Sequence, residues 1–314
     1  MSTLLLDSTL ELVNTREEFA GEGDCLVEVS HSSLNFKDAK VMRGDKDVVR
    51  TRPLVPGIDV VGTHEGQLVT INGHGLGEFR HGGYTEQVRV NADQIIPVPE
   101  RFSAQQAAAI GTAGYTAALS VVEIAEHYAD PASAGPVLVT GATGGVGSVA
   151  THLLSQLGFE VHALTGRAAE HGEWLRGLGA AEIVDRAEFA EAGKPLAKGT
   201  YAAVLDAVGS TVLANALARV RYGGIATACG LAGGADLPAT VLPFILRGVR
   251  LVGIDSVQAP REQRLKAWSL LSDTIDLQVL DGLTEVVPLA QAPKVGAELL
   301  AGQRRGRTVI DVRA

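Results

Sequence analysis

Residues 137–167 constrain the fold of this chain more than any other stretch. They read VLVTGATGGVGSVATHLLSQLGFEVHALTGR, in which a short apolar strand (137–140) enters a turn rich in glycine. A helix-compatible segment follows to Leu157, and a second apolar strand follows at 161–164. Strand, glycine turn, helix and strand in this order are typical of a parallel sheet that binds a dinucleotide.

The glycine turn predicts where the pyrophosphate of such a ligand binds. Glycine lets phosphate oxygens approach the backbone, and the free N–H groups at the start of the following helix hold the anion. The alternative is a glycine turn without a ligand, since Ala142 takes the leading glycine's place in strict G-x-G-x-x-G spacing. The candidate residues of this turn are Thr140, Gly141, Gly144, Gly145, Val146 and Gly147.

The end of the second strand indicates which dinucleotide is bound. NAD-specific folds usually place an acid there, which accepts hydrogen bonds from the ribose hydroxyls. This chain has Thr165, Gly166 and Arg167 instead. A hydroxyl, a compact glycine and a guanidinium suit a 2′-phosphate, so the sequence predicts NADP(H).

Composition excludes several classes of protein. The chain has 314 residues, enough for two domains, and a net charge of −9, which argues against nucleic acid or anionic membranes as partners. Two distant cysteines, Cys25 and Cys229, cannot build a disulfide framework. The first residues do not resemble a signal peptide, and no apolar run is expected to cross a membrane. We therefore expect a cytoplasmic protein.

The order of predicted elements indicates two domains. Short strands in the first third predict a β-rich region, whereas residues 137–254 alternate between strand and helix and predict a doubly wound parallel α/β sheet. Residues 131–136 are predicted as a loop and residues 213–220 as a helix. A closing strand at 306–311 implies that the first domain resumes after the second.

Eight segments, in order along the chain, resemble one known family. The resemblance is to the medium-chain dehydrogenase/reductase superfamily, and within it to the zinc-free quinone oxidoreductases of the acrylyl-CoA reductase branch. The segments are SLNFKD (33–38), PGIDVVGT (56–63), GGYTE (82–86), GTAGYT (111–116), GATGGVG (141–147), PFILRGVR (243–250), GIDS (253–256) and GRTV (306–309).

This resemblance implies a fold and a place for the active site. It implies a GroES-like catalytic domain (1–112 and 255–314), a Rossmann NADP-binding domain (113–254), and a site in the cleft between them. It also implies a homodimer joined through the strand at 249–254. Cys229, Gly230, Ile254 and Ser256 are the further cofactor-binding candidates.

The same resemblance bears on metal. Zinc-dependent relatives carry a Gly-His-Glu ligand motif where this chain has Gly57-Ile58-Asp59. Isoleucine cannot bind zinc, so we expect no metal. The alternative is a zinc site built from His64, Glu65, His74 and His81. The segment between Gly62 and Gly82 is also shorter than is typical of the family. Because this segment usually forms part of the cleft rim, the sequence does not predict how the substrate enters.

Asn35 and Asp38 are the candidate catalytic residues, because the resemblance implies that both lie near the nicotinamide and the substrate. An amide can donate a hydrogen bond to an enolate oxygen, and a carboxylate can orient neighbours or relay a proton. The alternative is a capping pair at the start of a helix. Tyr84 is a candidate substrate-binding residue, and the proton donor remains unassigned.

A basic cluster follows Asn35. Arg43, Lys46, Arg50 and Arg52 could hold the phosphates of coenzyme A, with Arg43 and Arg50 as the substrate-binding candidates. The alternative is a solvated loop, since Asp45 and Asp47 lie among them.

Together these features predict an NADPH-dependent, zinc-independent reductase of activated C=C bonds, with acrylyl-CoA or another short enoyl-CoA as the substrate. One alternative is an NADPH:quinone oxidoreductase. The other is an NADPH-binding protein without catalytic activity.

Overall fold

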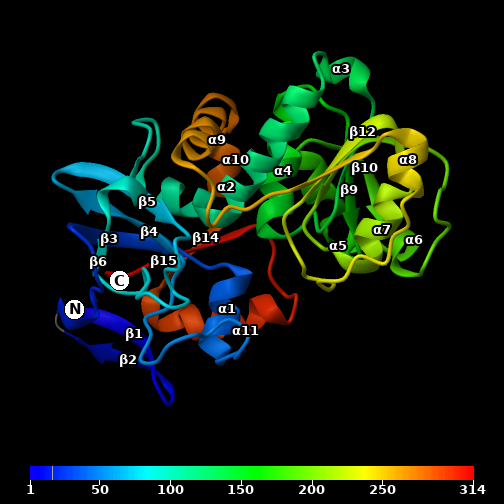
Figure 1. Ribbon diagram of the computed structural model, residues 1–314. Helices are drawn as coiled ribbons and strands as arrows, with labels where there is room; N and C mark the ends of the chain where they lie inside the picture. Colours follow the sequence, from blue (N-terminus) through cyan, green and yellow to red (C-terminus); the bar gives the residue numbers. More distant parts are fainter. Residues whose placement is uncertain (16) are drawn as a thin grey trace. The chain divides into compact units, whose positions relative to one another are not determined.

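The computed structural model describes residues 1–15 and 17–314, which form two compact units. Unit 1 comprises Met1–Tyr115, Ser256–Ser272 and Asp276–Ala314. Unit 2 comprises Thr116–Asp255 and Asp273–Ile275. Figure 1 shows the sheet of each unit with its surrounding helices.

Unit 2 is built on a six-stranded sheet in which every neighbouring pair is parallel. The strand order β10-β9-β8-β11-β12-β13 is that of a Rossmann fold, so the predicted doubly wound sheet is confirmed. The strands are β8 (Val137–Val139), β9 (Val161–Thr165), β10 (Ala180–Asp185), β11 (Tyr201–Asp206), β12 (Val220–Ala228) and β13 (Arg250–Gly253).

Helices connect these strands, and α4 packs against β8, β9 and β10. Two expectations need correction: residues 131–134 form a short helix within the expected loop, and the helix expected at 213–220 ends at Leu217, after which Val220 begins β12. The helices are α3 (Pro131–Ala134), α4 (Gly145–Gln156), α5 (Ala168–Gly177), α6 (Ala187–Ala190), α7 (Ser210–Leu217) and α8 (Leu242–Arg247).

The strand order also marks where a ligand binds. The chain leaves β8 toward β9 on one side, and later returns to β11 on the other side of β8. Such a switch point lies at the carboxyl ends of the strands and is where open α/β sheets hold ligands. The residues after β8 are those of the glycine turn.

Unit 1 is β-rich and has a sheet of order β14-β15-β3-β4-β5-β7, with β6 paired to β3 and a separate β1–β2 hairpin. Its closing strand pairs with β3 through Val309 and Ser33, which brings the two ends of the chain together. The strands are β1 (Ser2–Leu6), β2 (Leu10–Asn14), β3 (Cys25–Ser33), β4 (Asp59–His64), β5 (Gln67–Asn72), β6 (Gln87–Val90), β7 (Ile96–Pro97), β14 (Thr284–Pro288) and β15 (Arg307–Asp311).

Helices of unit 1 pack on this sheet, and α1 contacts α11. Buried residues from α1, α11 and seven strands (Val29, Val60 and Ile310 among them) form one hydrophobic core. The helices are α1 (Phe36–Arg43), α9 (Arg261–Thr274), α10 (Leu277–Gly282) and α11 (Ala292–Leu300), with 3₁₀ turns at Glu17–Phe19, Ala92–Gln94 and Leu289–Gln291.

Helix α2 (Ala104–His127) corrects one expectation about membranes. By length and composition it could cross a membrane, although no such run was expected. However, 83% of its most apolar window is buried within the protein, as in a core helix. The helix is also broken at Gly111, whose φ is +45° and ψ is −162°.

Candidate functional site

The glycine turn between β8 and α4 is tightly closed. Gly141 has a φ of +60°, and the N–H of Gly144 donates to its carbonyl at 2.9 Å. A Cβ on Gly147 would lie 2.4 Å from the Gly141 oxygen and 2.7 Å from the Ala142 Cα. Position 147 therefore accepts only glycine without a shift of the turn, and α4 begins with its backbone N–H groups uncovered by side chains.

Asp206, which sequence reasoning did not single out, joins this turn to β11. The Thr140 hydroxyl donates to its Oδ1 at 2.7 Å, and the Gly209 N–H donates to its Oδ2 at 2.7 Å. Burial raises the pKa of this carboxyl, which the hydrogen bonds from Thr140, Gly209 and Val208 oppose. The contacts fix the ends of β8 and β11 on the two sides of the switch point.

Two arginines stand at the end of β9. The Arg167 guanidinium reaches back to the glycine turn, where its Nη2 donates to the Thr143 hydroxyl at 2.8 Å. Arg186, which follows β10, donates its backbone N–H to the Thr165 carbonyl at 3.0 Å. A Cβ on Gly166 would meet three Arg186 side-chain atoms at 3.0–3.1 Å, so that guanidinium group lies directly over this glycine.

The sequence analysis did not identify Arg186 as a candidate cofactor-binding residue. It lies 19 residues beyond Arg167, and only the pairing of β10 with β9 brings it to the Thr165-Gly166-Arg167 corner. The uncovered helix start and the two guanidinium groups fit a dinucleotide with an additional phosphate on its ribose.

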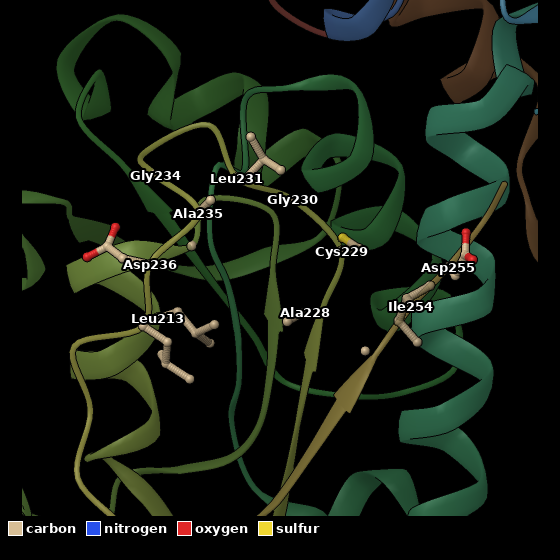
Figure 2. A pocket seen from close by; sticks show the side chains of 13 residues that line it. Leu213, Ala228, Cys229, Gly230, Leu231, Gly234, Ala235, Asp236, Ile254 and Asp255 are labelled. Carbon is tan, nitrogen blue, oxygen red and sulfur yellow. The ribbon is translucent and has the colours of Figure 1, made fainter. Parts of the chain in front are cut away.

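A pocket of about 520 Å³ lies beyond the carboxyl ends of β12 and β13. Three predicted cofactor residues, Cys229, Gly230 and Ile254, line it, and Figure 2 shows them on neighbouring segments. The Cys229 Sγ lies 3.2 Å from the Asp206 carbonyl, and burial raises the pKa of its thiol to about 12. Cys229 is thus a lining residue and not a thiolate nucleophile. Ser256 is grouped with unit 1 and does not line this pocket.

In unit 1, Asn35 and Asp38 meet a third polar residue, Asp59, which begins β4. The Asn35 Nδ2 lies 2.8 Å from Asp59 Oδ2 and 3.2 Å from Asp38 Oδ2. The Asn35 N–H also donates to Asp38 Oδ2 at 2.9 Å, which is the hydrogen bond that the N3 side chain of a capping box makes at the start of α1. The capping alternative is therefore present, and it coexists with a buried three-residue cluster.

Asp59 receives donors from four elements or loops. Besides Asn35, the donors are the Ser33 hydroxyl, the Asn72 amide at 2.5 Å, and the N–H and hydroxyl of Thr112 at 2.8 and 2.6 Å. These five donors solvate a carboxylate that has no access to water. Because the Thr112 N–H follows the break at Gly111, Asp59 also caps the second half of α2.

The orientation of the Asn35 amide corrects the role expected for it. Its nitrogen already serves two carboxylates and the Ser33 hydroxyl, which lies at 3.0 Å. The reverse orientation would turn the amide oxygen toward the Asp59 carboxylate at 2.8 Å, so the assigned orientation is favoured. Asn35, 8% exposed, therefore presents a buried acceptor, Oδ1, that has no partner in the described chain, instead of a donor for an enolate oxygen.

The environment of Asp38 holds a proton near neutral pH. Burial, followed by the charge of Asp59, raises the pKa of Asp38 to about 7, although N–H donors from Ile58 and Asn35 oppose the shift.

Beside this cluster, the Nε–H of Arg307 donates to the Ala109 carbonyl at 2.6 Å, and the buried Nη2 of Arg307 has no partner among the described residues. Burial also lowers the pKa of Arg307.

Gly111 is required by the same cluster. A Cβ there would lie 2.5 Å from Ser33 Oγ, 2.7 Å from Asp59 Oδ2 and 2.9 Å from Arg307 Nη2. With a positive φ as well, no other residue fits this position without displacing polar atoms of the cluster.

Tyr84, expected to bind substrate, is instead a core residue. Its ring is fully buried, and its hydroxyl donates to the Ser33 carbonyl at 3.1 Å. Burial raises the pKa of Tyr84 well above its ordinary value. Through this hydrogen bond to Ser33, Tyr84 stabilises the segment that leads to Asn35, and it offers no group to a ligand.

The basic cluster is partly neutralised by its own acids. Arg43 makes a two-point contact with Asp45, at 2.7 and 2.5 Å, so this candidate is paired. Lys40 pairs with Asp47, and Arg52 donates to the Asp7 carbonyl. Arg50 is exposed and has no ion pair in the part of the chain that the structure describes.

Residues 1–15 and 17–314 contain no group of three His, Cys, Asp or Glu side chains that could hold a metal. Two histidines of the alternative site are engaged elsewhere: His64 bonds the Leu26 carbonyl at 2.8 Å, and His81 accepts from the Val55 N–H at 3.2 Å. The third, His74, has a buried Nε2 without a partner among the described residues. Ile58 contributes its N–H to Asp38 Oδ1 at 2.8 Å.

Comparisons with known proteins identify the family. The acrylyl-CoA reductase AcuI of Ruegeria pomeroyi is 45% identical over 302 residues, which cover 93% of this chain and 91% of that protein. The chain belongs to the medium-chain dehydrogenase/reductase superfamily. The family model described as zinc-binding dehydrogenase matches residues 145–273, which lie largely in unit 2. A more distant member, the quinone oxidoreductase of Sus scrofa, is 26% identical over 91% of the chain and 88% of that protein.

Solved structures of related proteins have the same fold as this chain. The YhdH oxidoreductase of Salmonella enterica, in complex with NADP, superposes with a TM-score of 0.96 at 41% identity and covers 99% of both chains. YhfP of Bacillus subtilis, with NAD bound, gives a TM-score of 0.93 at 35% identity and covers 99% of this chain and 98% of its own. The predicted superfamily and its two-part α/β fold are confirmed.

Proposed function

We propose that this protein is an NADPH-dependent reductase of the activated C=C bond of a short enoyl-CoA such as acrylyl-CoA. The paired guanidinium groups of Arg167 and Arg186 at the end of β9 carry the choice of cofactor. The NADP complex of the Salmonella enterica protein supports the same cofactor. The likeness to AcuI supports the substrate class.

Residues of unit 2 would hold the cofactor. The turn at 141–147 and the start of α4 would bind the pyrophosphate, and Arg167, Arg186 and the Thr165 corner would bind the 2′-phosphate. Cys229, Gly230 and Ile254 would line the site of its reactive end. When bound, NADPH supplies the hydride for the reduction.

Residues of unit 1 would orient the reactants and hold a proton. The buried Oδ1 of Asn35 accepts a hydrogen bond from an N–H or O–H of the bound molecules, because no described residue fills that role. Asp38 keeps a proton up to about pH 7, within reach of the Asn35 amide. The buried Nη2 of Arg307, which no described residue engages, would be the donor of this cluster, a role that Asn35 cannot fill as oriented.

A comparison of substrates tests this proposal. We expect loss of NADPH absorbance with acryloyl-CoA at a kcat/KM at least tenfold above that with 1,4-benzoquinone, because the exposed Arg50 can pair with a phosphate, which a quinone lacks. A higher kcat/KM with benzoquinone would favour the quinone oxidoreductase alternative, which the Sus scrofa relative supports. No turnover with either acceptor would favour a non-catalytic NADPH-binding protein.

We also propose that the protein is a homodimer joined along β13. This strand is the edge of its sheet, and an uncovered edge is prone to pair with another chain. Beside it, α8 and the residue before it expose Val241, Ile245 and Leu246, at 62%, 68% and 57%. Light scattering should give about twice the chain mass, and Ile245→Asp should shift it toward the monomer. A monomeric parent protein would contradict this.

Two further expectations belong with this function. We propose that the reaction needs no metal, since Ile58 stands where a ligand would be needed. We also place the protein in the cytoplasm, in keeping with its two free cysteines.

A further inference from the structure

The loop at 73–82 is held by hydrogen bonds within its own backbone. The carbonyl of Gly75 accepts from the N–H groups of Glu78, Phe79 and Arg80 at 3.0–3.2 Å. Leu76 anchors the loop in the core, and the Arg80 guanidinium bonds the Gln94 side chain at 3.1 Å. The loop therefore presents its remaining side chains in fixed positions.

Phe79 is the large apolar side chain that this loop exposes. A Cβ on Gly75 would lie 2.1–2.6 Å from three atoms of the Phe79 ring, so the ring rests on the loop backbone. The side chain nevertheless remains 51% exposed. An aromatic ring that is supported on one side and open on the other can stack a base at little entropic cost.

The backbone of Arg50 pairs with the loop that carries this ring. The Arg50 N–H donates to the Glu78 carbonyl at 3.1 Å, which places Arg50 beside the residue that precedes Phe79. The acid of this loop, Glu78, is already paired with Lys37. Because Lys37 neutralises the charge of Glu78, the Arg50 guanidinium can attract a phosphate.

The loop also adjoins the Asn35 cluster. Lys37, the partner of Glu78, is two residues beyond Asn35 in α1. A Cβ on Gly77 would lie 3.0 Å from the Gly57 nitrogen, and the next residue, Ile58, donates to Asp38 at 2.8 Å. The loop that carries Phe79, with Arg50 paired to it, thus adjoins the segments of the residues to which we assign the chemistry.

We propose that Phe79 and Arg50 form a subsite for the phosphorylated adenine nucleotide of a coenzyme A thioester. The ring stacks the base, and the guanidinium pairs with a phosphate. This subsite rests on the proposed function and refines it, because it makes the CoA portion of the substrate the recognised part.

Calorimetric titration with free coenzyme A tests this subsite. We expect Phe79→Ala and Arg50→Ala each to weaken binding about tenfold. Phe79→Trp should keep it, and the exposed controls Tyr222→Ala and Lys194→Ala should leave it unchanged. The Kd for NADPH should not change in any of the five variants.

Turnover separates this inference from the proposed function. S-acryloyl-N-acetylcysteamine carries the same thioester without the nucleotide, so Phe79→Ala should raise KM for acryloyl-CoA about tenfold but not for this analogue. Equal coenzyme A affinity in the parent protein and both alanine variants overturns the subsite alone. Failure of the parent protein to reduce either thioester overturns the proposed function, and the subsite with it.

Discussion

Replacing Arg167 or Arg186 by alanine should weaken NADPH binding about ten- to a hundredfold and leave the Kd for NADH within about threefold. The Arg186 guanidinium lies over Gly166 and the Arg167 guanidinium reaches the Thr143 hydroxyl, so that both border the corner where the 2′-phosphate would bind, and NADH lacks this phosphate. Arg186→Lys should restore part of the loss, because it keeps the charge but not the planar two-point geometry.

Fluorescence titration with both cofactors measures this preference. Arg176→Ala is the matched control, since Arg176 lies on the exposed face of α5 and pairs only distantly with Glu173 at 4.0 Å. Equal losses for NADPH and NADH would show that the arginines support the fold and do not read the phosphate. An effect of Arg167 alone would remove Arg186 from the site.

Replacing Asp38 by asparagine should flatten the pH dependence of stability in unit 1. In the folded protein the pKa of Asp38 is raised from 3.8 to about 7, so the folded state binds a proton that the unfolded state has released. The free energy of unfolding contributed by this group is therefore largest below pH 4 and falls as the pH rises through 7. The total fall is on the order of 4 kcal/mol, and the amide of the variant cannot titrate.

Urea unfolding between pH 4.5 and 8.5 measures this difference. A Trp174→Phe background leaves Trp268, buried in α9, as the single tryptophan and hence as the reporter. The amide also disturbs three N–H contacts, but that cost is the same at every pH, so the slopes are compared. Asp7→Asn, at an exposed acid, is the control. Parallel curves for the parent and Asp38→Asn would contradict a protonated Asp38.

Local patterns predicted the elements of unit 2 well. The glycine turn before α4 and the end of β9 at Thr165 both depend on neighbours in the chain. The capping box of Asn35 and Asp38 is equally local, because its residues are three apart.

What sequence reasoning missed depends on strand pairing and burial. Arg186 reaches its corner only because β10 lies beside β9, and Thr112 reaches Asp59 from 53 residues away. The direction of the Asn35 amide depends on its contact with Asp59. In the sequence, Asp59 was considered only as part of Gly57-Ile58-Asp59, the segment compared with a zinc-ligand motif. Tyr84 was mistaken for a ligand contact, because a tyrosine in a polar segment does not reveal that its ring is buried.

The most direct test of the account is a calorimetric titration of the unaltered protein with NADPH and with NADH. Two guanidinium groups at the end of β9 predict that NADPH binds at least a hundredfold more tightly, at about one molecule per chain. Equal affinity for the two cofactors, a preference for NADH, or no heat with either would contradict the account.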